Sequence, residues 1–361
     1  MIGAKEAIVL VGGMGTRLRP LTVGTAKPML PVAGVPCIVH QLAFARAAGI
    51  KHVVLATSYR AETFTAELGD GSALGLRIDY VTEEEPLGTG GAIRNAADRL
   101  DGGSDDPVVV LNGDTLSGHD IPTQVTLHQQ RHAEVTIHLT EVEDARAFGC
   151  VPTDSTGRVV AFLEKMPQPV TNRVNAGCYV FRRSIIDAIP ADRVVSIERE
   201  TFPGLLQAGA LLLGYVEVAY WLDLGTPEAF VRGSRDLVTG RLTSSALPGP
   251  TGRALLLPGA KVDPSALVTG GSTLGRDVVV EAGAVVDGSV VLDGARIGAD
   301  ATVRDSIVGE GAGVGESCVV HGSVVGDRAQ VGARNELLAG VRVWSDAVLA
   351  DGAVRFSSDR S

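Results

Sequence analysis

A glycine-rich stretch near the start of the chain carries residue types suited to phosphate chemistry. The stretch begins at Leu10 and runs LVGGMGTRLRPLTVGTAKPMLPVAG, with Arg17 and Lys27 following its glycines. Glycines leave backbone N–H groups free to approach a phosphate chain, and the two cations can neutralise its charge. An ordinary glycine turn would not explain the three prolines that stiffen the same loop. The stretch therefore predicts a binding site for a small polyanion.

Two common phosphate loops do not fit this stretch. No Gly-Lys-Ser/Thr follows the glycines, which excludes a P-loop, and a GxGxxG fingerprint fails because Leu18 stands at its last glycine position. A nicotinamide site would also need an acidic residue at the end of the second strand, where HVVLATS ends in Thr57 and Ser58. The sequence therefore disfavours an oxidoreductase.

The elements around this loop alternate between apolar strands and helices. Strands are expected at residues 7–11, 52–56, 76–81 and 107–112, and helices at 36–49, 61–68 and 90–100. This order predicts a Rossmann-like, doubly wound α/β domain with a parallel sheet that binds ligands at the carboxyl ends of its strands. Further strands, partly antiparallel, are expected in VTIHLTEV, RVVAFLE, NAGCYVF and LLLGYVEV. These make the sheet mixed and are expected to form the second wall of a cleft.

The sequence changes character near residue 240. A Gly/Pro/Ser-rich linker is expected at 241–258, between a catalytic domain at 1–240 and a repeat domain at 259–361. In that last domain aliphatic residues recur every six positions, with an occasional five, which is typical of hexapeptide repeats in a left-handed parallel β-helix. An ordinary Gly/Val-rich sheet would not keep this period, and coils of about 18 residues would fit roughly five times. Such a solenoid needs its ends covered, so a homo-oligomer formed through the β-helix is expected.

Charge and composition exclude several classes of partner. The net charge of −10 argues against a nucleic-acid or membrane surface, since both need clustered cations. The sequence has no apolar run of membrane length and no signal peptide, so a cytoplasmic protein is expected. Its four cysteines lack CxxC spacing and are expected to be buried thiols rather than disulfides or zinc ligands.

Several motifs in order resemble one enzyme family along nearly the whole chain. They are GGMGTRLRPLT, KPMLPVAG, EEEPLGTGGAI, LNGDTL, FGCVPTD, FLEKMPQP, VNAGCYVF and WLDLGTPEAF. This set resembles the sugar-1-phosphate nucleotidyltransferases, also called nucleoside-diphosphate-sugar pyrophosphorylases. The resemblance implies attack of a sugar-1-phosphate oxygen on the α-phosphorus of a nucleoside triphosphate. Together with the repeat domain, it implies GTP and mannose 1-phosphate as substrates.

The residue types suit this reaction without a side-chain base. A phosphate monoester has a second pKa near 6, so the nucleophile is already an anion. The sequence offers no convincing Ser-His or Cys-His arrangement. Catalysis then consists of aligning two polyanions and neutralising their repulsion, which is expected of Arg17, Lys27 and a divalent metal.

The resemblance assigns Mg²⁺ to two aspartates. Asp114 directly follows the strand PVVVLN and Asn-Gly, and Asp223 stands in WLDLG. An aspartate in Asn-Gly-Asp is otherwise a common turn residue. Magnesium favours one or two carboxylates together with phosphate oxygens and water, which fits this pair.

The remaining site residues also follow from the resemblance. Lys165 is expected to contact the sugar phosphate, with Glu164, Asn175 and the Gly149 backbone contacting the sugar, although Glu164 and Lys165 could form an exposed charge pair. The predicted catalytic residues are Arg17, Lys27, Asp114 and Lys165, and the predicted substrate contacts are Gly149, Glu164, Lys165, Asn175 and Asp223. The predicted nucleotide contacts are Leu10, Gly12, Gly13, Gly15, Thr16, Arg17, Glu83, Gly88, Asn112 and Gly113.

The choice of base depends on Glu83. In related enzymes the position five residues before the glycine corresponding to Gly88 contacts the base, and that glycine would let a base approach the backbone. Guanine presents two adjacent donors, N1–H and the N2 amino group, and a carboxylate can accept both. Glu84 or Glu85 could serve instead, or the acidic run could be a solvated turn.

Three alternatives remain at this point. A catalytically silent regulatory homologue would be expected to lose phosphate or metal contacts, yet the predicted ones are present. An acyltransferase tail is disfavoured because Lys261 and His321 are the only lysine and histidine after residue 250. Within the enzyme class, a glucose-1-phosphate adenylyl- or thymidylyltransferase is the runner-up, and a cyclitol phosphate could satisfy the same sugar contacts.

Overall fold

The computed structural model describes residues 3–58 and 60–355 and separates them into two compact units. The first unit comprises the described residues of Met1–Gly13 and Gln41–Trp221, and the second those of Met14–His40 and Leu222–Ser361. The second unit therefore contains a segment from near the start of the chain together with the C-terminal repeats.

Parallel strands form the centre of the sheet in the first unit, as predicted. They lie in the order β6-β1-β4-β5 and comprise β1 (Glu6–Leu10), β4 (His52–Thr57), β5 (Arg77–Thr82) and β6 (Pro107–Asn112). Val and Ile are frequent in β1, β4 and β6 because these strands are buried on both faces, whereas β5 at the edge of the sheet is only partly buried. Leu10 lies opposite Asn112, so the carboxyl ends of β1 and β6 are adjacent.

The sheet continues beyond β6 with mixed polarity. Its further strands are β8 (Val135–Glu141), β9 (Gly149–Cys150), β10 (Leu163–Glu164), β11 (Arg173–Arg182) and β12 (Leu212–Val216). β11 is antiparallel to β6 and β8, whereas β12 is parallel to β8. The strand expected over RVVAFLE is shorter than predicted, and only Leu163–Glu164 form β10. The first two residues of the run form isolated bridges instead, Arg158 with Leu213 and Val159 with Thr153.

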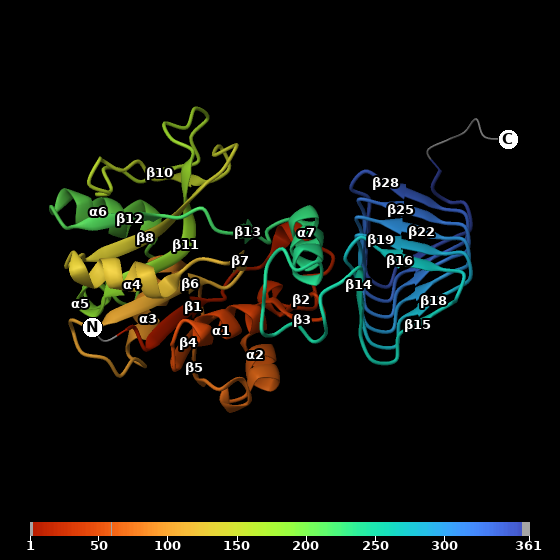
Figure 1. Ribbon diagram of the computed structural model, residues 1–361, viewed down its shortest axis with the longest axis horizontal. Coiled ribbons are helices and arrows are strands. Elements are labelled where there is room, and N and C mark those ends of the chain that lie inside the picture. Colours follow the sequence, from red (N-terminus) through yellow and green to blue (C-terminus); the bar gives the residue numbers. More distant parts are fainter. Residues whose placement is uncertain (1–2, 59, 356–361) are drawn as a thin grey trace. The chain divides into compact units, whose positions relative to one another are not determined.

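Helices cover this sheet at several points (Figure 1). α3 contacts β1, β4 and β5, and α4 contacts β6, β8 and β11. The α-helices of the described residues are α1 (Cys37–Ala47), α2 (Ala61–Leu68), α3 (Gly88–Ala97), α4 (Ile121–Gln130), α5 (Arg183–Asp187), α6 (Phe202–Gln207) and α7 (Pro227–Val238). Short elements are β7 (Thr115–Ser117), β13 (Trp221–Asp223) and the turns η3 (Ser72–Leu74) and η4 (Ile197–Thr201).

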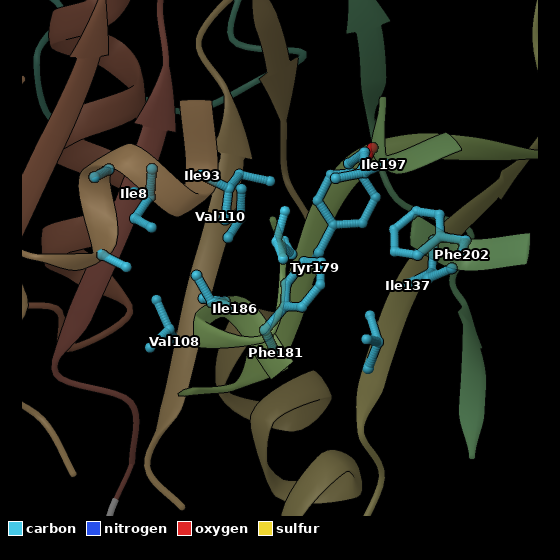
Figure 2. Packing of buried hydrophobic residues seen from close by; sticks show 14 of the residues in the cluster. Ile8, Ile93, Val108, Val110, Ile137, Tyr179, Phe181, Ile186, Ile197 and Phe202 are labelled. Carbon is cyan, nitrogen blue, oxygen red and sulfur yellow. The ribbon is translucent and has the colours of Figure 1, made fainter. Parts of the chain in front are cut away.

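The core of the first unit combines aliphatic and aromatic side chains. Figure 2 shows Ile8 and Ile93 at one side of the cluster, Tyr179 and Phe181 near its middle and Phe202 at the other side. Each of these side chains is fully buried, and burial of one stabilises the fold by about 1.5–3 kcal/mol. This core holds β1, β6 and β11 in fixed register.

The described residues of the tail form three parallel sheets of short strands, as expected for a β-helix (Figure 1). The first sheet contains β14 (Ala254–Leu256), β17 (Ser272–Leu274), β20 (Val290–Val291), β23 (Ile307–Val308), β26 (Val324–Val325) and β29 (Arg342–Val343). The second contains β15 (Lys261–Val262), β18 (Val279–Val280), β21 (Arg296–Ile297), β24 (Gly313–Val314), β27 (Gln330–Val331) and β30 (Val348–Leu349). The third contains β16 (Leu267–Thr269), β19 (Val285–Asp287), β22 (Thr302–Arg304), β25 (Val319–His321) and β28 (Glu336–Leu338).

Hydrogen bonds between buried serines of successive coils show how many residues each coil contains. The N–H of Ser289 donates to Ser272 Oγ, 17 residues earlier, and the same bond recurs from Ser306 to Ser289 and from Ser323 to Ser306. A coil of 17 residues is one shorter than three full hexads, which agrees with the occasional spacing of five.

None of the helices in the described residues is long and apolar enough to cross a membrane. The four cysteines are buried thiols, as predicted; they are Cys37, Cys150, Cys178 and Cys318.

Candidate active site

In the second unit the glycine-rich segment is folded into a closed loop by Gly15. Its 3₁₀ turns are η1 (Thr16–Leu18) and η2 (Lys27–Met29), followed by β2 (Pro31–Val32) and β3 (Val35–Pro36). Gly15 has φ 56°, and a Cβ there would lie 2.9 Å from Lys27 Cβ. Thr22 Oγ1 donates to the Gly15 carbonyl at 2.8 Å. A glycine is therefore needed where the two halves of the loop touch.

In this unit two cationic side chains of the predicted site lie close to one of its predicted carboxylates. Arg17 Nη2 lies 4.0 Å from Asp223 Oδ2, and Lys27 Nζ lies 3.7 Å from Asp223 Oδ1. The Arg17 side chain is 66% exposed, whereas that of Lys27 is 11% exposed. Asp223 thus orients both cations, while the exposed guanidinium can still meet an anionic ligand.

Gly225 is a residue of this cluster that the sequence did not single out. A Cβ on Gly225 would lie 2.5 Å from Arg17 Nη2, so the guanidinium rests against its backbone. The next residue, Thr226, caps α7 by accepting from the Ala229 N–H at 3.2 Å. The WLDLGTPEAF motif thus supplies an acid, a glycine that makes room for Arg17, and a helix start.

In the first unit several predicted residues gather at the carboxyl ends of β1 and β6. The Gly113 N–H donates to the Leu10 carbonyl at 2.9 Å, and a Cβ on Gly113 would lie 2.7 Å from Val11 Cγ1. Asp114 follows in the turn to β7 and is partly buried. Gly12 also lies here, since a Cβ on it would lie 3.0 Å from Ser58 Oγ.

Two further residues support Asn112 at the end of β6. Gly177 on β11 has φ 75°, and a Cβ there would lie 2.6 Å from Asn112 Nδ2. The buried Gln41 from α1 donates from Nε2 to the carbonyl of Asn112 at 3.4 Å and to Thr115 Oγ1 at 3.0 Å. Sequence reasoning missed both; the glycine inside the strand run NAGCYVF was the available signal.

Glu83 is distinguished from its acidic neighbours by burial. Its side chain is half-buried, whereas Glu84 and Glu85 are exposed. Oε2 accepts from the Leu87 N–H at 3.1 Å, while Oε1 is buried without a hydrogen-bond partner among the described residues. Burial raises the pKa of this carboxyl, and the bond from Leu87 acts in the opposite direction. An acceptor oxygen is thus held out of water and available to a ligand.

The structure gives Gly88 a role in packing. It has φ 72°, and a Cβ there would lie 2.6 Å from the Val195 carbonyl oxygen. That carbonyl accepts from the N–H groups of Gly90 at 2.8 Å and Gly91 at 3.3 Å. The glycines of EEEPLGTGGAI therefore allow the chain near Val195 to pack against the start of α3. This packing role does not depend on the predicted contact of Gly88 with the base.

The predicted sugar contacts lie together where β9 and β10 pair. Glu164 is opposite Gly149, and a Cβ on Gly149 would lie 2.8 Å from Glu164 Oε2. Lys165 Nζ lies 3.7 Å from Glu164 Oε1 and its side chain is 65% exposed. On β11, Asn175 donates to the Tyr179 hydroxyl at 2.7 Å and accepts from the Gly177 N–H at 3.0 Å. Its amide is held in place yet keeps one proton and one lone pair for a ligand.

Comparison with known proteins identifies the family of the chain. The family model described as nucleotidyl transferase matches residues 6–240, and a model described as GMPPB C-terminal domain matches residues 251–354. The chain belongs to the nucleotidyl transferase family.

The sequences of relatives with assigned activities align with most of the chain. It is 57% identical over 355 residues to a mannose-1-phosphate guanylyltransferase of Mycobacterium tuberculosis, which covers 98% of both chains. It is 36% identical to mannose-1-phosphate guanylyltransferase 1 of Arabidopsis thaliana over 80% of this chain and 79% of the relative. Among solved structures, HddC from Yersinia pseudotuberculosis, also solved in complex with GMP-PN, aligns with TM-score 0.56 and 29% identity over 64% of this chain and 98% of that one.

Proposed function

We propose that this chain transfers a guanylyl group from GTP to mannose 1-phosphate, producing GDP-mannose and pyrophosphate. The observation that carries the proposal is the 57% identity, over 98% of both chains, to a mannose-1-phosphate guanylyltransferase. The half-buried Glu83, with an unpartnered acceptor oxygen, supports guanine as the base, because guanine offers two adjacent donors.

The reaction is a single in-line displacement at phosphorus. An anionic oxygen of mannose 1-phosphate forms a bond to the α-phosphorus of GTP, and the bond from that phosphorus to the oxygen bridging to the β-phosphate breaks. Pyrophosphate leaves with the electron pair of that bond. No proton must be removed from the nucleophile near neutral pH, because its second pKa is near 6.

The chain's contribution is charge neutralisation and alignment. Arg17 and Lys27, both oriented by Asp223, are proposed to bind the phosphates of GTP. Lys165, with Glu164 and Gly149 in the β9–β10 pair, is proposed to bind mannose 1-phosphate. Such fixed charges stabilise a transition state because they need no reorganisation as charge develops.

Magnesium is proposed as the cofactor, with Asp114 and Asp223 as its ligands. Two carboxylates without histidine or thiol match the hard-oxygen preference of this ion. When bound, Mg²⁺ would neutralise phosphate charge. The Asp223 carboxylate already lies near two positive charges, those of Arg17 and Lys27. A homo-oligomer formed through the β-helix is also part of the proposal.

A pyrophosphate-release assay over a matrix of nucleoside triphosphates and sugar 1-phosphates tests the proposal. We expect the largest kcat/KM for GTP with mannose 1-phosphate, and product analysis should find GDP-mannose. Faster turnover of ATP or dTTP with glucose 1-phosphate would contradict the proposed substrates. Absence of turnover with every pair would contradict catalysis itself.

A further inference from the structure

The phosphate-binding segment belongs to the same compact unit as the C-terminal repeats. Residues Met14–His40 cluster with the described residues of Leu222–Ser361 rather than with the sheet of the first unit. α7 contacts both β2 of this segment and β17 of the β-helix. The loop that carries Arg17 and Lys27 is therefore packed against elements that sequence reasoning assigned to association.

One contact reaches the turn that carries Arg17. Arg342 on β29 donates from Nη1 to the carbonyl oxygen of Arg19 at 2.8 Å. The adjacent Pro20 is buried, and a Cβ on Gly326 would lie 2.9 Å from Pro20 Cγ. The Arg19 N–H in turn closes η1 by donating to the Thr16 carbonyl at 3.2 Å. The β-helix thus supports the last turn of η1 by a hydrogen bond and by contact.

Arg342 differs in its partner from four of the other arginines on the β-helix. Arg276, Arg296, Arg328 and Arg334 each pair with a carboxylate of the tail. Within the described part of the chain, Arg342 has no such ion pair, and its guanidinium is directed to a backbone carbonyl. A guanidinium bonded to a single carbonyl fixes the position of that peptide group without cancelling a charge.

The other end of the segment is fastened to the same domain. The buried Ser234 Oγ accepts from the Ala33 N–H at 3.0 Å and lies 3.1 Å from Thr273 Oγ1 on β17. A Cβ on Gly34 would lie 3.0 Å from both methyl carbons of Leu257. The segment is therefore held at Arg19 on one side of Lys27 and at Ala33 on the other.

We propose that Arg342 is a positioning residue for nucleotidyl transfer, through which the β-helix orders the η1 turn and so the guanidinium of Arg17. The inference rests on the proposed function, because its kinetic test uses that reaction. An ordered loop need not lose conformational freedom when the triphosphate binds, and misplacement of an aligning cation slows the chemical step. This gives the tail a role in catalysis besides association.

The test compares Arg342→Ala with Arg296→Ala, an exposed tail arginine whose partner is Glu281. Loss of a charge-assisted hydrogen bond to the turn should lower kcat about tenfold in Arg342→Ala. KM for mannose 1-phosphate should change little, and Arg342→Lys should recover part of the loss. Arg296→Ala should match the wild type in kcat. Light scattering should give the same assembly for all variants.

Amide hydrogen exchange provides a readout that does not depend on substrate. The N–H groups of Leu21 and Val23, which bond to the carbonyls of Leu18 and Pro20, should exchange faster in Arg342→Ala and not in Arg296→Ala. If the wild type shows no transferase activity but Arg342→Ala still exchanges faster, the proposed function is contradicted. The structural coupling between Arg342 and the η1 turn is then still supported. Unchanged kcat with unchanged exchange in Arg342→Ala would overturn the inference, as would equal effects of the two alanine variants.

Discussion

Replacement of Glu83 by glutamine tests the origin of base selection. In the wild type, Oε1 is a buried acceptor without a partner among the described residues, and Oε2 already accepts from Leu87. Glutamine keeps the shape of the side chain but replaces one acceptor by a donor. That donor must face either the Leu87 N–H or one of the two guanine donors. One hydrogen bond is lost in either case, and a donor–donor contact replaces it.

The size of this effect follows from the strength of charge-assisted bonds. Hydrogen bonds to charged groups contribute about 1.5–3 kcal/mol, so loss of one should lower kcat/KM for GTP about 10- to 150-fold. The kcat/KM for ATP should fall much less, because adenine presents one donor beside one acceptor at the same edge. The exposed Glu84 provides the matched control, and Glu84→Gln should behave as the wild type.

The assay is pyrophosphate release with GTP and with ATP across a range of pH. Because burial raises the pKa of Glu83, its carboxylate is lost at a higher pH than that of an exposed glutamate. The value of kcat/KM for GTP should therefore fall on acidification, and the part of this fall that comes from Glu83 should be absent in Glu83→Gln, which keeps the fall caused by protonation of the sugar phosphate. An unchanged ratio of GTP to ATP use in Glu83→Gln, or an equal change in Glu84→Gln, would refute the assignment.

Further predictions concern the metal, the arginine pocket and the tail. Asp114→Asn and Asp223→Asn should each largely abolish turnover, the double variant should add little, and EDTA should inhibit the wild type reversibly; near-normal activity of either single variant with Mg²⁺ would contradict the assignment. Gly225→Ala should displace the guanidinium that touches it and lower kcat at least about tenfold, with a change in unfolding free energy below about 0.5 kcal/mol. Gly24→Ala, at a glycine with open space around it, is its control, and equal kcat in the two variants would refute the packing argument. Deletion of residues 245–361 should change the assembly state measured by light scattering; an unchanged oligomer would show that the tail does not mediate association.

Periodicity and local motifs were sufficient to predict the architecture. Alternation of apolar strands and helices predicted the parallel centre of the sheet, because burial on both faces demands continuous Val and Ile runs in β1, β4 and β6. The six-residue period predicted the β-helix, because each short face must turn one aliphatic side chain inward. The strand in RVVAFLE was predicted too long, since its first two residues form isolated bridges with Leu213 and Thr153, and apolar pattern alone does not reveal those pairings.

The sequence by itself determined which residue types stand at the ends of strands, and from these it predicted binding of phosphates, hydroxyls and a hard cation. Tertiary structure decided which of those residues share an environment. Only the fold separates Glu83 from Glu84 and Glu85 by burial, and only the fold sets Gly225 against Arg17. Arg342 lies 323 residues from Arg19 in sequence, yet their hydrogen bond joins the β-helix to the glycine-rich segment. Such contacts depend on how distant segments close on one another, and local propensity and periodicity carry no information about that closure.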